Sequence, residues 1–121
     1  MRLHLLLASV AIAGATAFSA VAEDGQYGAS LSRMLREAAA GNCAADLMAG
    51  ELLTACEAQI AGMATGLASL GAIEAVTFVS AEDTPNGRVE TYAVKFAGGM
   101  TMNWVIGGFS EGKFSVAGTA G

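Results

Sequence analysis

The chain has 121 residues, 54% of them hydrophobic, with 6 Lys and Arg residues against 11 Asp and Glu residues. Its formal net charge of −5 and its scattered cations leave no phosphate-neutralising patch, which argues against nucleic acid and anionic membrane surfaces as partners. A single histidine and two cysteines form no metal-site spacing, so we expect no bound metal and no cofactor.

The first 22 residues have the pattern of a secretory signal peptide. Arg2 supplies a positively charged start, an interrupted apolar run follows, and residues 20–22 (Ala-Val-Ala) form a small-x-small cleavage sequence. The run is too short for a membrane span, which needs roughly 20 apolar residues. We therefore predict cleavage after residue 22, export to the periplasm or the cell exterior, and one domain over residues 23–121 that has no membrane contact after cleavage.

Cleavage would also remove His4, the only histidine of the chain. Catalytic Ser-His-Asp and Cys-His arrangements both need an imidazole as base. The predicted mature chain therefore could not assemble either arrangement by itself.

Two helices are expected in the first half of the mature chain. Apolar residues at three- and four-residue spacing predict a helix over 27–40, which Gly41 would end. A short helical piece over 43–48 and a turn at 49–50 then lead into a long helix over 51–70. The apolar residues of this long helix keep a 3.6-residue period, which is typical of one face packed on a core.

The long helix also carries a row of small residues four apart: Ala58, Gly62 and Gly66. In a membrane such a row would suggest helix pairing. The polar residues in the same segment argue against a membrane helix, so we expect the row to allow close packing of the helix against a sheet.

From residue 73 the hydrophobic pattern changes to a period of two, which indicates β-strands. The pattern predicts four strands, at 73–80, 88–97, 100–109 and 113–117. Short connections between successive strands make the expected sheet an antiparallel meander. The predicted fold class is α+β, with a short N-terminal helical hairpin leading into one long helix, all packed on this four-stranded sheet.

The pairing of the second and third strands depends on the loop between them. A two-residue loop at 98–99 would put Trp104 on the face opposite Tyr92. A three-residue loop starting at the same glycine would pair Phe96 with Met102 and would gather the apolar residues on one face. We prefer the three-residue loop, because a one-residue slip would move that apolar set off the core.

Cys43 and Cys56 are expected to form a disulfide, because paired cysteines in an exported chain are usually oxidised. The predicted turn at 49–50 lies midway between them, and closing a loop of this size is worth about 3 kcal/mol. A redox-active pair is the alternative, but it would require a C-x-x-C spacing at a helix start. We therefore predict a structural bond.

The second half of the mature chain carries a distinctive order of landmarks. A helix ends at Leu70-Gly71, and the strand Tyr92-x-Val94-x-Phe96, the pair Trp104-x-Ile106 and the turn Gly112-Lys113 follow. This order resembles small exported domains of the nuclear transport factor 2-like (cystatin-like) superfamily.

The resemblance implies a curved sheet wrapped around a helix, often with a conical pocket and often dimeric through the sheet. The spacing from Phe96 to Trp104 is one residue longer than this pattern, so we expect a β-bulge there. Some members of the superfamily are isomerases or dehydratases and many have no catalytic role, so the resemblance indicates a fold and no particular activity.

Four large side chains are candidates for a ligand-binding site or an interface: Phe78, Tyr92, Met102 and Trp104. They could line an apolar pocket, with Trp104 as the best interface residue if that face is exposed. The alternative is that they simply form the core between sheet and helix.

Three carboxylates, Glu57, Glu74 and Glu90, could act as a general base if buried with a raised pKa. We expect them to be solvated charges instead, because carboxylates are rarely buried without partners. Glu90 shares a strand face with Arg88, and the two are expected to protect a sheet edge.

These observations favour an exported, non-enzymatic binding or interaction module that holds a small apolar ligand or a partner protein, with a homodimer as the expected assembly. Two alternatives stay open. One is a cofactor-free isomerase- or hydrolase-like enzyme that uses a pocket carboxylate with Tyr92. The other is an inhibitor of an extracellular enzyme that uses an exposed loop at 82–87.

Overall fold

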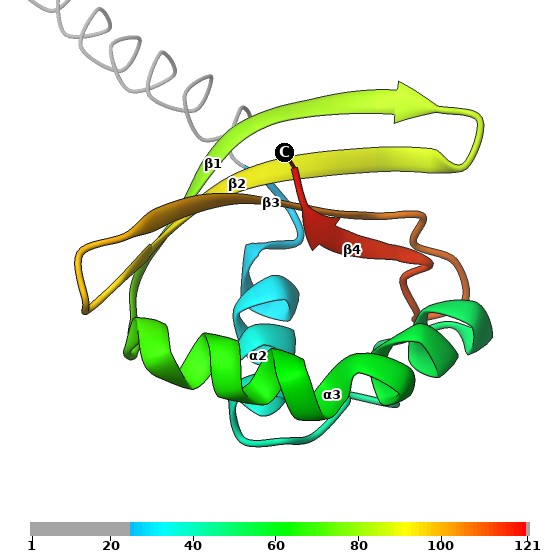
Figure 1. Cartoon of the computed structure of the whole chain (residues 1–121). Coiled ribbons are helices and arrows are strands. Elements are labelled where there is room, and N and C mark those ends of the chain that lie inside the picture. The colour runs from blue at the N-terminus through cyan, green and yellow to red at the C-terminus, as the bar shows by residue number, and fades with distance from the viewer. Residues whose placement is uncertain (1–24, 121) are drawn as a thin grey trace, which may run out of the picture.

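The computed structural model describes residues 25–120, so the predicted signal peptide at 1–22 lies outside the described residues. Within these residues, two helices precede four strands, in the arrangement that Figure 1 shows. The elements are α2 (Gly28–Ala39), α3 (Gly50–Leu70), β1 (Ile73–Thr84), β2 (Gly87–Phe96), β3 (Thr101–Gly107) and β4 (Val116–Thr119). The α+β class and the long helix are confirmed.

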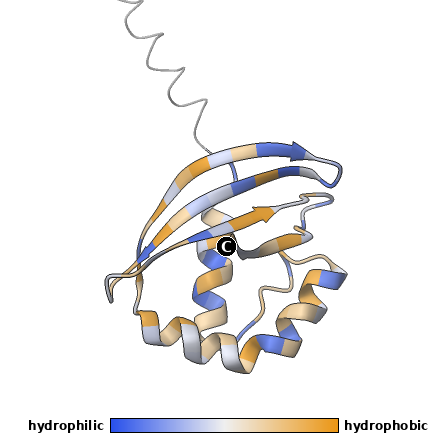
Figure 2. Cartoon of the chain, turned by 45° about the horizontal axis from the view of Figure 1, so that its top comes forward, coloured by the Kyte–Doolittle hydropathy of each residue, from blue (hydrophilic) through white to orange (hydrophobic). Residues whose placement is uncertain are grey.

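The four strands form one antiparallel meander in the order β1-β2-β3-β4. The sheet curves, and both helices lie on its concave side, with α3 running beneath the sheet (Figure 1). Hydrophobic and hydrophilic residues alternate along the strands in Figure 2, as expected for a sheet with one face on the core.

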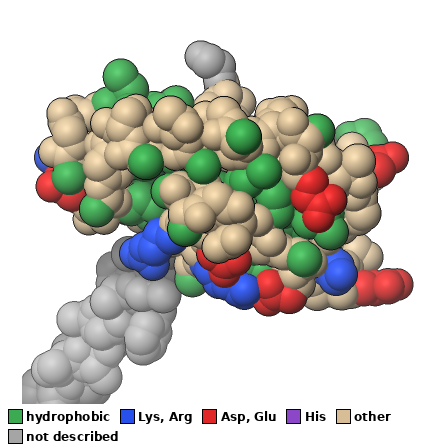
Figure 3. Space-filling model, turned by 60° about the horizontal axis from the view of Figure 1, so that its bottom comes forward, with side chains coloured by type: hydrophobic (Ala, Val, Ile, Leu, Met, Phe, Trp, Pro, Cys, Tyr) green, Lys and Arg blue, Asp and Glu red, His purple; other side chains and the backbone are tan. Residues whose placement is uncertain are grey.

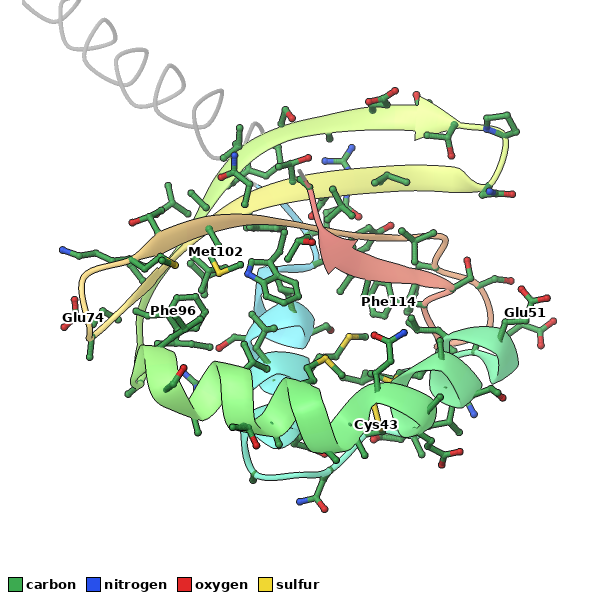
Figure 4. All side chains as sticks on the ribbon, in the orientation of Figure 1. Cys43, Glu51, Glu74, Phe96, Met102 and Phe114 are labelled. Atoms are coloured by element: carbon green, nitrogen blue, oxygen red, sulfur yellow. A yellow bond between two sulfur atoms is a disulfide. The ribbon has the colours of Figure 1, made fainter. Side chains whose placement is uncertain are left out.

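The core lies between the concave face of the sheet and the two helices. Val94 of β2 and Ile106 of β3 are completely buried, and Leu31 of α2 is nearly so. Burying a side chain of this size contributes about 1.5–3 kcal/mol. In Figure 4, Phe96, Met102 and Phe114 point into this space, whereas Glu51 and Glu74 point away from it at the two ends of the molecule.

The register of β2 and β3 differs from the predicted one by two residues. Tyr92 pairs with Trp104 and Val94 with Met102, and the loop spans residues 97–99. A shift of two residues preserves the face of every side chain. The predicted gathering of the large apolar residues on one face is therefore confirmed, although the predicted pairs are wrong.

Contacts with the end of α3 explain why the loop starts earlier than predicted. The backbone N–H of Ala97 donates to the carbonyl of Ala72 at 2.7 Å, and the N–H of Gly98 donates to that of Leu70 at 2.9 Å. A Cβ atom at Gly98 would lie 2.8 Å from the Leu70 carbonyl oxygen, so the approach requires glycine.

The predicted bulge between Phe96 and Trp104 is wrong as well. The irregularities in the sheet lie between β1 and β2, at Ile73/Ala75 and at Phe78/Ser80. They add residues to the edge strand β1, where bulges are common.

Residues 43–48 do not form the predicted helical piece, and a turn covers 45–47 instead. The backbone here pairs with the far end of the chain: the N–H of Phe114 donates to the Leu47 carbonyl, and the N–H of Ala49 donates to the Phe114 carbonyl, both at 2.8 Å. Six residues are too few to form a stable helix alone, so these long-range bonds determine the conformation.

The same pairing explains why β4 begins at Val116 instead of at residue 113. Residues 110–113 form a tight turn closed by hydrogen bonds between Ser110 and Lys113, and Phe114 then pairs outside the sheet. Only the last four strand residues remain to pair with β3.

The row of small residues on α3 faces away from the sheet, so the expected close approach is wrong. A Cβ atom at Gly62 or Gly66 would meet no atom within 4 Å, and Ala58 is exposed. The opposite face of the helix, with Cys56 and Leu67 buried, provides the contact with the core. Over residues 25–120 no helix combines the length and apolar character that a membrane crossing requires.

The predicted disulfide is present between Cys43 and Cys56, whose Cα atoms lie 6.1 Å apart. It ties the segment after α2 to the second turn of α3 (Figure 4). A disulfide of this kind is consistent with an oxidising, non-cytoplasmic compartment.

Candidate functional site

An apolar cavity of about 330 Å³ lies between α2, α3 and the strands β3 and β4. We call it the apolar cavity. The apolar stripe of α3 forms one wall through Leu52, Cys56 and Met63, and Trp104 and Ala117 form the sheet-side wall. The 3.6-residue period of α3 therefore places every third or fourth side chain along the cavity.

No charged side chain of residues 25–120 lines the apolar cavity. Its polar side chains are those of Gln59 and Thr119, which are exposed. Figure 3 shows hydrophobic side chains across the underside of the molecule, whereas most of the charged side chains visible there lie along its lower margin.

Three methionines, Met34, Met48 and Met63, contribute to the wall of the apolar cavity. Methionine is unbranched and polarisable, so it adapts its shape to whatever it contacts. A methionine-lined cavity can therefore adjust to ligands of different outline more readily than one built from branched side chains.

Trp104 combines burial with an unused hydrogen-bond donor. Its side chain is part of the buried core, at 8% exposure, and it lines the apolar cavity. Its Nε1 atom has no hydrogen-bond partner among residues 25–120. A buried donor without an acceptor costs about 1–3 kcal/mol of stability, and the Nε1 atom is covered by the surrounding protein.

The four predicted site residues do not form one site. Trp104 lines the apolar cavity, whereas Phe78 and Tyr92 line an open groove beside the start of α2, with ring centroids 5.7 Å apart. Met102 lines neither and packs against the core. The strand pattern correctly placed Tyr92, Met102 and Trp104 on the concave face, but it could not separate the two ends of that face.

Glu90 was expected to be a solvated charge, and that expectation is wrong, because its side chain has 0% exposure. Its carboxylate accepts hydrogen bonds from the backbone N–H groups of Gln26 at 2.9 and 3.0 Å and Tyr27 at 2.9 Å. It also accepts from the Tyr92 hydroxyl at 2.6 Å and from Nε of Arg88 at 2.7 Å. We call these five residues the Glu90 cluster.

Burial raises the pKa of Glu90, but the hydrogen bonds from Tyr92, from the two backbone N–H groups and from Arg88 lower it by more. The net effect holds the pKa below the ordinary glutamate value, so the group is ionised at neutral pH. Burial, followed by the hydrogen bond to Glu90, raises the pKa of Tyr92, which therefore stays protonated.

The Glu90 cluster holds the chain at the start of α2. The carboxylate binds N–H groups of the two residues immediately before the helix, where a negative charge is favoured by the helix dipole. Glu90 also lies on β2, which is an interior strand, so the predicted edge-protecting role with Arg88 is wrong.

Glu90 and Tyr92 are hydrogen-bonded to each other, as the enzyme alternative required. Both groups, however, are used to hold the backbone before α2. Glu90 is not exposed and lines neither the apolar cavity nor the groove. Glu57 and Glu74 are exposed, as expected, and Glu74 lies 3.8 Å from the Lys95 ammonium. The strand alternation puts Glu90 on the same face as Tyr92 and Val94, which is a signal for its inward direction, but the alternation does not indicate the donors that make its burial possible.

The remaining sequence-derived candidates give no further ligand-binding site. Residues 82–87 comprise the end of β1, a two-residue turn at 85–86 and the first residue of β2. The Thr84 hydroxyl accepts from the N–H of Asn86 and donates to the Gly87 carbonyl. Within the described part of the chain, no group of three or more His, Cys, Asp or Glu residues could hold a metal ion. Comparisons with family models, with curated proteins and with solved structures found no match for this chain.

Proposed function

We propose that the protein binds a small, uncharged, apolar molecule in the apolar cavity. The observation that carries the proposal is a cavity of about 330 Å³ whose wall holds no charged side chain among the described residues. Ligand sites are usually concave and mostly apolar, with a few polar groups that orient the ligand. The apolar cavity opens to solvent beside Ala55, Gln59 and Thr119, which are exposed, so a small molecule can enter it.

The volume indicates the size of the ligand. An apolar cavity of about 150 Å³ holds one benzene ring. The apolar cavity is about twice that size, so it suits a molecule of about two fused rings. The adaptable methionine side chains in its wall support some tolerance of shape.

We place this binding outside the cytoplasm. The signal-peptide pattern of residues 1–22 and the Cys43–Cys56 disulfide support export. Membership of the nuclear transport factor 2-like superfamily is part of the same proposal, and the curved sheet over a long helix supports it. A pocket enclosed by such a sheet and helix is the expected ligand site of that fold.

Titration with naphthalene tests the proposal, followed by two-dimensional ¹H–¹⁵N NMR of the disulfide-bonded protein. We expect the backbone signals of cavity residues such as Leu52, Cys56 and Met63 to shift in a saturable way, while those of the β1–β2 turn stay in place. An absence of saturable shifts in the cavity residues would contradict the proposal.

A matched pair of variants on α3 locates the site. Ala55 lines the apolar cavity, and Ala61 is exposed on the same helix outside it. Ala55→Phe should weaken naphthalene binding at least tenfold by filling the mouth, whereas Ala61→Phe should leave it unchanged. Equal effects of the two substitutions would place the ligand elsewhere.

A further inference from the structure

We infer that Asn86, in the turn between β1 and β2, is a site of spontaneous deamidation in the folded protein, with water as the only co-reactant. Asn86 is followed by Gly87, and both residues are exposed. The chain has two other asparagines, Asn42 and Asn103, and each precedes a residue with a large side chain. We expect the reaction at Asn86 and not at the other two, so the protein should slowly acquire a more acidic form.

The reaction closes a five-membered ring at the turn. The backbone nitrogen of Gly87 attacks Cγ of the Asn86 carboxamide, the new nitrogen–carbon bond forms, and the Cγ–Nδ2 bond breaks. Ammonia leaves and carries away the proton of the attacking nitrogen. Water then opens the cyclic imide at one of its two carbonyl carbons. Breaking the bond to Cγ leaves aspartate, and breaking the other bond leaves isoaspartate, in which the main chain runs through Cγ.

The turn requires glycine at the residue that supplies the attacking nitrogen. Gly87 has a φ of 99°, in the left-handed region that residues with side chains rarely adopt. A Cβ atom there would meet only the Cα of Gly108, at 4.0 Å, so the space around this residue is open. Side chains at this position normally hinder the approach of the nitrogen to Cγ. The turn geometry therefore places after Asn86 the residue that hinders ring closure least.

The hydrogen bonds of the turn do not use the Asn86 carboxamide. The Thr84 hydroxyl accepts from the backbone N–H of Asn86 at 3.0 Å and donates to the Gly87 carbonyl at 2.9 Å. Thr84 and Gly87 also form the last pair of the β1–β2 ladder. Terminal pairs open more readily than interior ones. The end of the hairpin, at the margin of the sheet in Figure 1, therefore allows the backbone movement that ring closure needs.

The other two asparagines lack this combination of features. Asn103 lies in β3, which pairs with strands on both sides, and the nitrogen after it belongs to the buried Trp104. Asn42 is exposed, but the nitrogen after it belongs to Cys43, whose side chain is fixed in the disulfide. Strand pairing restrains the first of these residues and a side chain hinders both, so each should react much more slowly than Asn86.

Both products change the turn and leave the apolar cavity intact. Each adds one negative charge beside Glu82 and Asp83, and isoaspartate also lengthens the main chain where the Thr84 hydroxyl binds. None of residues 82–87 lines the apolar cavity. Naphthalene should therefore bind equally to fresh and deamidated protein, and the modification and the proposed function can succeed or fail separately.

Incubation of the disulfide-bonded protein in mildly alkaline buffer, at a temperature where circular dichroism shows it folded, tests the inference. Cleavage after glutamate separates the three asparagines into residues 38–51, 83–90 and 91–111. Mass spectrometry should show the replacement of NH2 by OH only in residues 83–90, as two chromatographic species, one with aspartate and one with isoaspartate. Isoelectric focusing of the intact protein should show the matching shift of one negative charge.

Two matched variants locate the reaction. Asn86→Gln should abolish the acidic form, because glutamine would have to close a six-membered ring, which is slower. Asn42→Gln should retain it. Both positions are exposed, so neither substitution threatens the fold.

A synthetic peptide of residues 83–90 sets the time scale. If this segment stayed unchanged in the folded protein while the free peptide was converted, the turn would protect Asn86 and the inference would be overturned. Equal conversion at Asn42 or Asn103 would overturn it as well. Aspartate formed without isoaspartate would also overturn it, because opening of the cyclic imide gives both products.

Discussion

The hydroxyl of Tyr92 donates a 2.6 Å hydrogen bond to Oε1 of Glu90, two positions earlier on β2. The same hydroxyl accepts from the backbone N–H of Tyr27 at 3.1 Å. Two side chains of one strand thereby hold the segment that precedes α2 against the sheet. The pair attaches the segment before α2 to the interior strand β2. Substituting either side chain should therefore lower the stability of the domain more than its affinity for a ligand.

Glu90→Gln should destabilise the domain by about 2–3 kcal/mol, because hydrogen bonds to a charged group are worth about 1.5–3 kcal/mol. Glutamine keeps one acceptor oxygen, but its NH2 group would face a donor, either a backbone N–H or Arg88, where the carboxylate oxygen now accepts. Urea unfolding followed by circular dichroism measures the change. Glu57→Gln is the matched control, and its exposed position predicts a change within about 0.5 kcal/mol. Similar losses in the two variants would contradict the role of the Glu90 cluster.

The contribution of Glu90 should depend on pH in one direction. Its pKa is lowered in the folded protein, so its stabilisation is fully present above the unfolded-state value of about 4.3 and is lost as the pH falls through the lower folded-state value. The difference in unfolding free energy between the wild type and Glu90→Gln should be constant from about pH 6 to 8 and shrink in acid. Urea unfolding between pH 2.5 and 8 tests this, and a difference that grows in acid would contradict it.

Replacing both Cys43 and Cys56 by alanine should cost about 3 kcal/mol, the value expected for closing a loop of this length. Urea unfolding of the oxidised wild type and of the double variant gives the difference. A reducing agent should destabilise the wild type and leave the double variant unchanged. Two free thiols detected by mass spectrometry in protein from an oxidising compartment would contradict the bond.

Gly62→Ala should stabilise the domain by up to about 1 kcal/mol, because alanine is the better helix former and the added Cβ meets no atom within 4 Å. Gly98→Ala should destabilise it, since the Cβ would lie 2.8 Å from the Leu70 carbonyl oxygen. Thermal unfolding of the two variants measures both signs. Destabilisation by Gly62→Ala would mean that the small-residue face of α3 is covered in solution.

The sequence by itself determined the parts of the fold that follow from local periodicity. The 3.6-residue stripe of α3, the two-residue alternation of β2 and the pairing of Cys43 with Cys56 were all predicted correctly. The face shared by Tyr92 and Trp104 was also correct, because parity survives a register shift of two. The helix stripe and the strand alternation depend on which side chains recur along each element, and the disulfide follows from the presence of just two cysteines.

Only the tertiary structure decided the conformation of residues 43–48, the hydrogen-bond partners of Glu90 and the position of the apolar cavity. Residues 47–49 pair with the backbone of Phe114, more than 60 residues away, and the segment 43–48 does not form a helix. Glu90 is buried because four donors from two chain segments converge on it, and no local pattern records that convergence. The apolar cavity likewise exists only because α3 and β4, distant in sequence, approach without filling the space between them.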